Sequence, residues 1–412
     1  MKEIKVGIIG FGTVGAGVAA NLLANGDVIA KRTGVKLTLA KIADLDITTD
    51  RGVKVPDGIL TTDANALIRD VDVVVELIGG TTVACDFILK ALKAGKPVVT
   101  ANKALLATRG AEIFAAAEAA GVDVYYEASV AGGIPVIKAL REGLVANRIN
   151  RIYGIMNGTC NYILTRMEAE KADFGDVLAD AQKLGYAEAD PSLDIDGFDT
   201  AHKAAILASL AYGEWFGLKP VYVEGIRGIE QQDLEFADEL GYRIKLLATI
   251  KQIDGDVQVR VHPTLVPKQA LLANVSGVFN AVLIEGDTVG QTLFYGRGAG
   301  RAATASAVVA DLADVALNLA SGSPRRIPAF RPGKQFGAVT PMADIQSRYY
   351  LRMQVVDAPG VVAAIAEVLA RHAISIASFV QREGARDSKS VTVFFTTHEA
   401  RESAVKIGRA HV

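Results

Sequence analysis

Short apolar runs alternate with segments of helical periodicity over residues 1–133 of the chain. The apolar runs fall at 4–9, 37–43, 71–78, 96–101 and 122–127, and helical segments at 17–23, 83–94 and 104–120 separate them. Strands that alternate with helices form a parallel sheet with helices on both of its faces. We therefore predict an α/β chain that begins with a doubly wound parallel sheet.

A different pattern follows over residues 134–303. Strand patterns at 148–156, 221–223, 242–251 and 256–262 accompany helices at 136–146, from Tyr162 and over 199–208. This order favours a sheet with mixed or antiparallel pairing in an α+β domain. By analogy, such a domain often carries the subunit contacts of a homodimer or homotetramer. The helix expected at 304–321 returns to close the first domain.

The C-terminal part is predicted to be a small separate module. Residues 322–347 contain several prolines and are expected to be a linker. Over 348–412 a strand at 349–356, a helix at 361–371 and strands at 374–381 and 390–397 give the order β-α-β-β of a ferredoxin-like unit. Residues 407–412 resemble the translation of a sequencing adapter rather than a native continuation of the protein. We therefore expect this module to be incomplete, without its last helix and edge strand.

The first predicted strand runs directly into the glycine pattern of a dinucleotide-binding turn. Gly10, Gly12 and Gly15 follow the strand and open a helix. In a Rossmann fold the first glycine permits the tight turn, the second lets the backbone approach a pyrophosphate and the third lets helix and strand pack closely. The intervening residues are assigned to the same cofactor site, and these are Phe11, Thr13 and Val14.

Two further positions extend the predicted cofactor site. Asp44 ends the second strand, where an acid can accept hydrogen bonds from ribose hydroxyls, which favours NAD over NADP. A plain turn role for Asp44 is about equally compatible with the sequence. Gly300 ends a second glycine-rich turn, 295–300, which can cradle an anion before the helix at 304–321.

Polar residues gather at the predicted carboxyl ends of the strands, where ligands of such sheets bind. Thr100, Asn102, Lys103 and Glu127 all follow strands directly. A similar group, Asn157, Gly158 and Thr159, stands before the helix from Tyr162. Those residues are predicted to be helix caps or substrate contacts.

An acidic loop at 188–199 leads into a helix that carries a lysine. Glu188, Asp194 and Asp199 precede Lys203, and Asp199 and Lys203 are four residues apart, so they share one face of the helix. This arrangement suits a substrate with an amino group and a lysine that transfers a proton. The alternative is a solvated helix start whose acids favour the helix dipole.

Composition excludes several classes of protein. The 412 residues are 50% hydrophobic with a formal net charge of −2, which argues against a nucleic-acid-binding surface. Cys85 and Cys160 form neither a disulfide framework nor a metal-binding spacing. The sequence shows no signal peptide and no apolar run long enough to span a membrane, so we expect a cytoplasmic protein.

The chain resembles the homoserine dehydrogenase family over nearly its whole length. Six blocks in the same order carry the resemblance: GFGTVGAG at 10–17, TANKALLA at 100–107, EASVAGGIPVI at 127–137, MNGTCNYILT at 156–165, LGYAEADPSLDIDGFDTAHKAAILA at 184–208 and YGRGAGRAATASAVVADL at 295–312. The family interconverts L-homoserine and L-aspartate 4-semialdehyde with NAD(P), in threonine, methionine and isoleucine biosynthesis.

The resemblance implies roles for individual residues. Lys203 corresponds to the catalytic lysine, Lys103 to a second lysine near cofactor and substrate, and Glu188 and Asp199 to substrate-binding acids. Gly300 corresponds to a cofactor contact. A structural sodium site is implied at Glu127 and the backbone carbonyls of Val130, Gly132 and Ile134. The tail resembles an ACT domain, which implies L-threonine as an effector near the turn at 357–360 or, alternatively, a dimerisation module without ligand.

One departure from the family concerns cofactor choice. Many members have a basic residue where this chain has Ala43, and its loss puts a strict NADP preference in doubt. Two rival functions stay open at this point. One is a related dehydrogenase of another small amino-acid aldehyde, and the other is a non-catalytic sensor that keeps the cofactor fold and the ACT module.

Overall fold

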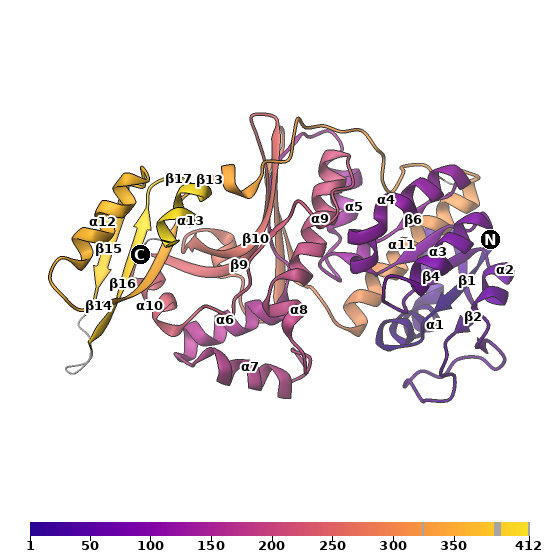
Figure 1. Cartoon of the computed structure of the whole chain (residues 1–412). Coiled ribbons are helices and arrows are strands. Elements are labelled where there is room, and N and C mark those ends of the chain that lie inside the picture. The colour runs from indigo at the N-terminus through magenta and orange to yellow at the C-terminus, as the bar shows by residue number, and fades with distance from the viewer. Residues whose placement is uncertain (324, 383–388, 411–412) are drawn as a thin grey trace.

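The computed structural model describes residues 1–323, 325–382 and 389–410, with side chains as far as Lys406 in the last helix. The molecule is elongated, with the N-terminal sheet at one end, a second sheet in the middle and the C-terminal module at the other end (Figure 1). Position 324 and residues 411–412, on which parts of the linker and adapter predictions fall, lie outside the described residues.

The N-terminal domain is a six-stranded parallel sheet with the order β3-β2-β1-β4-β5-β6. Its strands are β1 Lys2–Ile9, β2 Val35–Ala43, β3 Leu60–Thr61, β4 Val73–Glu76, β5 Val98–Thr100 and β6 Val124–Tyr125. The helices are α1 Thr13–Thr33, α2 Ala64–Asp70, α3 Val83–Lys93 and α4 Lys103–Ala120. The chain order reverses at β1, between β2 and β4, so the predicted doubly wound sheet is confirmed.

Helix α11, Arg301–Ser321, returns to this domain from far along the chain and lies among its indigo and purple elements in Figure 1. Its residues Ala305, Val308 and Leu312 pack with α1 and β1 in one buried cluster. Of the described residues, only α11 is long and apolar enough, by length and composition alone, to span a membrane. However, 56% of its most apolar stretch is buried, which is the pattern of a core helix.

The middle domain is built on a mixed six-stranded sheet with the order β12-β11-β7-β9-β10-β8. Its strands are β7 Ile149–Ile155, β8 Tyr222–Val223, β9 Tyr242–Ile253, β10 Asp256–Pro267, β11 Phe279–Gly286 and β12 Gly290–Arg297. The helices are α5 Val136–Lys138, α6 Gly158–Glu170, α7 Phe174–Lys183, α8 Ser192–Ile195, α9 Phe198–Tyr212 and α10 Gln231–Glu239. Only β8 pairs in parallel, with β10, so the prediction of mixed pairing is confirmed.

Two local predictions in this domain differ from the structure. The helix expected at 136–146 is α5 followed by a π-helical turn, Ala139–Gly143. The acidic loop contains a short helix, α8, which ends before Gly197; that glycine has a φ of 88° and redirects the chain into α9. Positive φ strains other residues, so the glycine makes this break between the two helices possible.

The C-terminal module has a three-stranded antiparallel sheet with the order β14-β16-β15. Its elements are β14 Tyr350–Val356, α12 Val361–Arg371, β15 Ile376–Gln381, β16 Ser390–Thr397, β17 Ala400–Arg401 and α13 Glu402–Ala410. The predicted β-α-β-β order is confirmed. The expected loss of the last helix is wrong, because α13 follows β16 and its Val405 is buried in the module's core. Short β17 pairs with β13, Gln346–Ser347.

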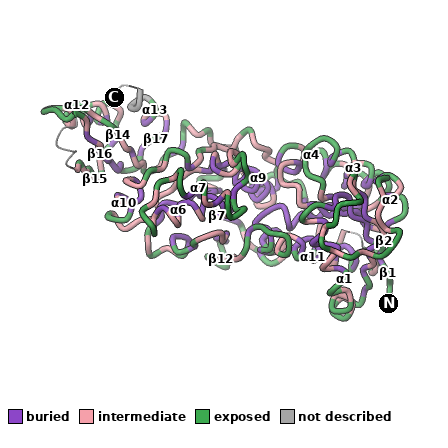
Figure 2. The backbone as a smooth tube through the Cα atoms, turned by 90° about the horizontal axis from the view of Figure 1, so that it is seen from below, coloured by how far each residue is buried: buried purple, intermediate pink, exposed green. Residues whose placement is uncertain are grey.

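The segment predicted as a linker lies along both the N-terminal and the middle domain. Tyr126 donates a hydrogen bond to the backbone oxygen of Ala329 (2.9 Å), and the N–H of Gly333 donates to Gly213 (2.8 Å). Val339 forms a parallel bridge with Val257. Buried residues, purple in Figure 2, occur inside both the N-terminal and the middle domain.

The glycine turn permits a paired test of packing. A Cβ on Gly15 would lie 2.0 Å from the backbone oxygen of Gly10, whereas one on Gly12 would have nothing within 4 Å. We expect Gly15→Ala to lower the free energy of unfolding by about 1–3 kcal/mol or more through overpacking. Gly12→Ala should leave it nearly unchanged. Urea denaturation checks both, and equal stability of the two variants would contradict the packing of β1 against α1.

Candidate active site

The most buried charged pair in the middle domain comes from one turn of α9. Lys203 Nζ donates hydrogen bonds to Asp199 Oδ2 (2.7 Å) and to the backbone oxygen of Met156 (2.5 Å). Both residues are less than a tenth exposed. The predicted shared face of Asp199 and Lys203 is therefore confirmed, and the solvated alternative is wrong.

A second lysine reaches the same carboxylate from the N-terminal domain. Lys103 begins α4 directly after β5, and its Nζ lies 3.2 Å from Asp199 Oδ1. Its side chain keeps 35% of its exposure, so one side of the ammonium stays open to a ligand. Each Asp199 oxygen thus faces one lysine, and the two domains meet at this ion pair.

Asn157 holds the carboxylates of Asp194 and Asp199 in place. Its side-chain oxygen caps α6 by accepting the N–H of Cys160, while its nitrogen donates to Asp194 Oδ1 (2.7 Å) and Asp199 Oδ2 (2.8 Å). Thr159 donates to Asp194 Oδ2 (3.2 Å) and to the backbone oxygen of Tyr186 (2.6 Å). The cap role predicted for Asn157 is therefore confirmed, and its side-chain nitrogen also joins Asp194 to Asp199.

The charges of the cluster are set by burial and by its lysines. Burial raises the pKa of Asp199, but the charges of Lys203 and Lys103 outweigh it, so this pKa lies below the usual range. Burial and the neighbouring charge of Asp199 raise the pKa of Asp194. The buried carboxylate of Asp199 and the half-buried one of Asp194 therefore have opposite tendencies, an arrangement that active sites often use.

Other predicted residues lie around this cluster without joining it. Glu188 is exposed on the loop before α8, and its carboxylate has no hydrogen bond or ion pair within the described residues. Gly158 starts α6, where a Cβ would lie 2.8 Å from the backbone oxygen of Val278. His202 was not predicted; it is buried beside Lys203 and its Nδ1 lacks a hydrogen-bond partner in the described part of the chain. The only feature of the sequence that could have indicated His202 is its position directly before Lys203.

The glycine turn has the shape that a dinucleotide requires. Gly10 has a φ of 102°, Gly12 leaves open space beside the N-terminus of α1, and Gly15 packs against the turn. Free N–H groups at a helix N-terminus attract phosphate. Thr13 is exposed and Val14 half-buried in the first turn of α1, so both border this space. The residues present therefore fit a dinucleotide.

Phe11 and Asp44 stabilise the glycine turn. The Phe11 side chain is buried in the core. Its N–H donates to Asp44 Oδ2 (2.5 Å), and Asp44 Oδ1 accepts the N–H of Asp46 (3.0 Å). Asp44 thus has a turn role and still lies beside the glycine turn. Ala43 is buried with its side chain in the core, so a basic residue there would not reach the cofactor directly.

A buried carboxylate that the sequence did not reveal organises the neighbouring strand ends. Glu76 ends β4 and accepts hydrogen bonds from Thr100 Oγ1 (2.7 Å) and from the N–H of Ile78 (2.9 Å). Burial raises its pKa. Thr100 is therefore a support for the β4 turn, with its hydroxyl directed to Glu76. The feature of the sequence that could have indicated this role is the position of Glu76, an acidic residue directly after three valines.

The late glycine turn meets the loop after β6. A Cβ on Gly132 would lie 2.3 Å from the backbone oxygen of Gly298. The N–H of Gly133 donates a hydrogen bond to the backbone oxygen of Arg297 (3.1 Å). Gly300 has a φ of 114°, and a Cβ added to it would have no described atom within 4 Å, so it faces open space at the start of α11. That space suits the predicted cofactor contact.

The loop assigned to sodium contains a carboxylate whose oxygens are already occupied. Both Glu127 oxygens accept N–H groups, from Ile137 and Lys138, at 2.8 Å each. In the described residues no cluster of three metal-ligating side chains occurs. The carbonyl oxygens of Val130 and Gly132 accept no hydrogen bond there, whereas that of Ile134 accepts the N–H of Val136 (2.8 Å). The carbonyls of Val130 and Gly132 are therefore the predicted ligands that fit a hard cation best.

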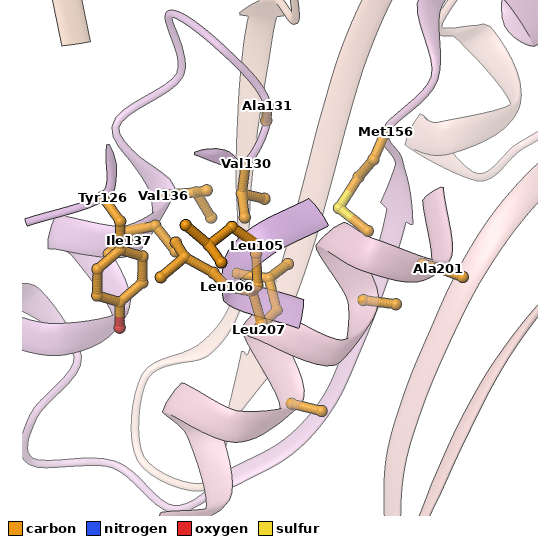
Figure 3. Close-up of a cluster of buried hydrophobic side chains, with 14 of the residues drawn as sticks. Leu105, Leu106, Tyr126, Val130, Ala131, Val136, Ile137, Met156, Ala201 and Leu207 are labelled. Carbon is orange, nitrogen blue, oxygen red and sulfur yellow. The ribbon is translucent and has the colours of Figure 1, made fainter. Parts of the chain in front are cut away.

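Packing beneath the cluster locks the two lysine-bearing helices together. Figure 3 shows Leu105 and Leu106 of α4 beside Leu207 of α9, with Met156 directed toward the same helix. Trp215 donates its indole N–H to the backbone oxygen of Leu106 (2.7 Å). Lys103 and Lys203 therefore approach Asp199 from helices with a common rigid core.

A dinucleotide-binding domain joined to a buried lysine–carboxylate cluster indicates an NAD(P)-dependent oxidoreductase. Family models support this class: the homoserine dehydrogenase NAD-binding domain matches residues 10–127, homoserine dehydrogenase matches 135–313 and the ACT domain matches 349–407. A homoserine dehydrogenase of Neisseria gonorrhoeae is 47% identical over 411 residues, covering 98% of this chain and 94% of its own.

Other relatives agree. A homoserine dehydrogenase of Pseudomonas aeruginosa is 47% identical over 417 residues, covering 98% of this chain and 94% of its own. The crystal structure of a homoserine dehydrogenase from Thiobacillus denitrificans is similar with a TM-score of 0.93 and 46% identity, covering 100% of this chain and 94% of that one. The chain belongs to the homoserine dehydrogenase family.

The charge balance of the cluster predicts how stability depends on pH. Because the pKa of Asp199 is depressed, its ion pairs stabilise the fold above the ordinary pKa of an aspartate, and this contribution is lost as pH falls through the depressed value. Lys203→Met should cost about 3 kcal/mol near neutral pH by leaving a buried charge short of partners. Loss of the Lys203 charge should raise the pKa of Asp199 in the variant, because burial is then less opposed. The cost should therefore shrink as the pH falls and the carboxylate of the variant protonates before that of the wild type.

Unfolding free energies measured at several values between about pH 8 and pH 4.5 check this expectation. The double variant Lys203→Met/Asp199→Asn is the matched control, because it removes the unpaired charge as well and should recover part of the loss. A deficit of Lys203→Met that stays constant over the whole pH range would contradict the assigned ion pair.

Proposed function

We propose that the protein interconverts L-homoserine and L-aspartate 4-semialdehyde, with Lys203 as the group that transfers the proton. The observation that carries the proposal is the shared Asp199 carboxylate, which lies between Lys203 (2.7 Å) and Lys103 (3.2 Å). Two ammonium groups near one site suit an oxygen that gains negative charge during the reaction.

The bound dinucleotide would supply hydride exchange at the carbon of the alcohol or aldehyde. Lys203 would hold the proton at the substrate oxygen, donating it as the aldehyde becomes an alcohol and accepting it in the opposite direction. Asp199 orients the ammonium of Lys203 through their hydrogen bond. Lys103, with its partly open side, would bind the same oxygen or the cofactor side of the substrate.

Carboxylates near the cluster would select the amino group of the substrate. Glu188 is exposed with a free carboxylate, and Asp194 borders Asp199 through Asn157. An ammonium ligand would satisfy both kinds of acid, and it would offset the burial that raises the pKa of Asp194. This favours an amino-acid substrate over an aldehyde without the amino group, and the intact lysines favour an enzyme over a sensor.

For the cofactor we propose NAD(P) with a preference for NAD. Asp44 lies beside the glycine turn, where a carboxylate accepts ribose hydroxyls and repels a 2′-phosphate. Arg51 is the nearest basic residue on this side, and its guanidinium pairs with Asp46 (3.0 Å). Because the side chain at Ala43 faces the core, the preference depends on Asp44 alone.

Several accessory features are proposed with the same function. The carbonyl oxygens around Val130 and Gly132 would hold a structural sodium ion. A homodimer or homotetramer is proposed because β12, at the edge of the middle sheet, bears partly exposed apolar residues such as Tyr295. L-Threonine is the proposed effector of the ACT domain, near Gly360. Two free buried cysteines fit a reducing cytoplasm and the proposed role in threonine, methionine and isoleucine biosynthesis.

Removal of the proposed proton-transfer group tests the mechanism. We expect Lys203→Ala to lower kcat for L-homoserine oxidation by roughly 10²–10⁴-fold, since general acid–base catalysis contributes that much. Cofactor affinity, measured by fluorescence titration of the reduced dinucleotide, should change little. Lys183→Ala is the control, because Lys183 is an exposed lysine paired with Asp180. Near-normal turnover of Lys203→Ala would refute the assigned role.

Cofactor preference has its own test. Initial rates of L-homoserine oxidation should give a higher kcat/KM with NAD than with NADP. Asp44→Asn should lower the ratio of kcat/KM with NAD to kcat/KM with NADP by roughly tenfold, because it removes a negative charge that repels the 2′-phosphate. A wild-type preference for NADP, or a ratio that Asp44→Asn leaves unchanged, would contradict the role of Asp44.

A further inference from the structure

A tryptophan outside the active-site cluster is inserted into the helix that carries Lys103. Trp215 follows α9 in the chain and is half-buried. Its indole N–H donates to the backbone oxygen of Leu106 in α4 (2.7 Å). In a regular α-helix this oxygen accepts the N–H of residue 110. The indole therefore takes up an acceptor that belongs to the hydrogen-bond ladder of α4, and the proposed reaction gives Trp215 no role.

The backbone of α4 is shaped around this indole. A Cβ on Gly110 would lie 2.1 Å from both Cε2 and Nε1 of Trp215, so a side chain at this position would overlap the ring. The φ of Gly110 is not positive, so the backbone conformation does not require glycine there. Alanine is normally the better residue inside a helix. The space that the indole occupies is therefore the physical reason for a glycine within α4.

Helix α4 bends at the place where the indole enters. Arg109, between Leu106 and Gly110, has a φ of −127° and a ψ of 15°, which lie outside the helical range. Proline and inserted side chains are the common causes of a sharp bend in a helix. Because α4 contains no proline, the inserted ring of Trp215 accounts for the bend at Arg109.

Aromatic rings and the end of α9 hold Trp215 in this orientation. Its ring centroid lies 4.7 Å from that of Phe114 in α4 and 5.0 Å from that of Phe330, whose ring plane is at 89° to the indole. Edge-to-face pairs of this kind favour one orientation of the rings. The N–H of Phe216, the next residue, donates to Ser209 Oγ in α9 (3.0 Å). The indole is therefore fixed relative to both α4 and α9.

The part of α4 before the bend is fixed at both of its ends. At its start, Asn102 caps the helix with its side-chain oxygen and donates its side-chain N–H to the backbone oxygen of Gly80 (2.7 Å). At its end, Leu106 accepts the indole N–H of Trp215. Lys103 is the first residue of α4 and lies between these two contacts. The position from which its side chain starts therefore depends on both of them.

We propose that Trp215 is a positioning residue, which bends α4 and thereby places the ammonium of Lys103 at its distance of 3.2 Å from Asp199 Oδ1. This inference rests on the role of Lys103 in the proposed reaction. A displacement of about 1 Å at a reacting group can lower a rate about 10²-fold. The bend therefore matters for turnover, although Trp215 acts only through the helix.

Removal of the indole tests the proposal. We expect Trp215→Phe, which shortens the ring and removes its N–H, to lower kcat for L-homoserine oxidation roughly 10- to 100-fold. The dissociation constant of the reduced dinucleotide should change little. Phe216→Leu is the matched control, because Phe216 is the neighbouring aromatic residue and its ring stacks on Phe336 (5.1 Å). It should keep near-normal turnover. Circular dichroism and the melting temperature show that each variant is folded.

A double-mutant cycle separates positioning from a general loss of stability. Lys103→Ala removes the group through which Trp215 is proposed to act, so Trp215→Phe should lower the residual kcat of that variant by less than about twofold. A merely structural role would lower kcat by the same factor in both backgrounds. Gly110→Ala should lower kcat in the wild type by displacing the indole, and much less in Trp215→Phe, where the ring is smaller.

The hydrogen bond can also be removed while the shape of the ring is kept, because Trp215 is the only tryptophan of the chain. Protein produced with benzothienylalanine in place of tryptophan carries sulfur instead of the indole N–H at this one position. We expect its kcat to lie between those of the wild type and Trp215→Phe. The amides of residues 103–108 should exchange with deuterium faster than in the wild type, and they should do so in Trp215→Phe as well.

Two kinetic results would overturn the proposal. One is near-normal kcat in a folded Trp215→Phe variant, and the other is an equal loss of kcat with and without Lys103. If Trp215→Phe does not fold, the benzothienylalanine protein takes its place in both comparisons. A wild type that does not oxidise L-homoserine would refute the proposed function instead. Deuterium exchange over residues 103–108 then decides the inference alone, and unchanged exchange would overturn it.

Discussion

The ion pair between Asp199 and its two lysines is the interaction on which the rest of the site depends. It joins α9 of the middle domain to α4 of the N-terminal domain, so the proposed proton donor and the dinucleotide cradle are held in one frame. A buried carboxylate with a single partner would be destabilising. Asp199 instead has Lys203, Lys103 and Asn157, and this full set of partners explains why three charged groups persist in a nearly closed space.

The cofactor end of the site follows a different logic, in which backbone shape matters more than charge. Gly10 and Gly15 permit a close turn, and Gly12 leaves space for a ligand at the N-terminus of α1. Glu76 then fixes the neighbouring strand ends through Thr100 and the backbone of the β4 turn. The two halves of the site meet at the start of α4, because Lys103 follows shortly after the end of β5. The proposed hydride exchange and proton transfer would thus take place beside Lys103, where α4 begins at the carboxyl end of β5.

Sequence and structure agree best where a local pattern has one physical solution. The glycine turn, the spacing of Asp199 and Lys203 and the β-α-β-β order of the tail were all predicted and are all present. Agreement is poorer where long-range packing decides. Ala43 faces the core, Thr100 supports Glu76, and the Glu127 carboxylate binds backbone N–H groups. A residue's neighbours in space are not encoded in its neighbours along the chain, so these roles were out of reach.

The sequence by itself determined the order of domains, the dinucleotide turn and the family, because glycine geometry and helical periodicity act over a few residues. Only the tertiary structure decided which charges meet. It brought Lys103 of the first domain to Asp199 of the second. Such pairings depend on the angle at which helices and sheets pack, and that angle follows from the shape of the whole core rather than from any single segment.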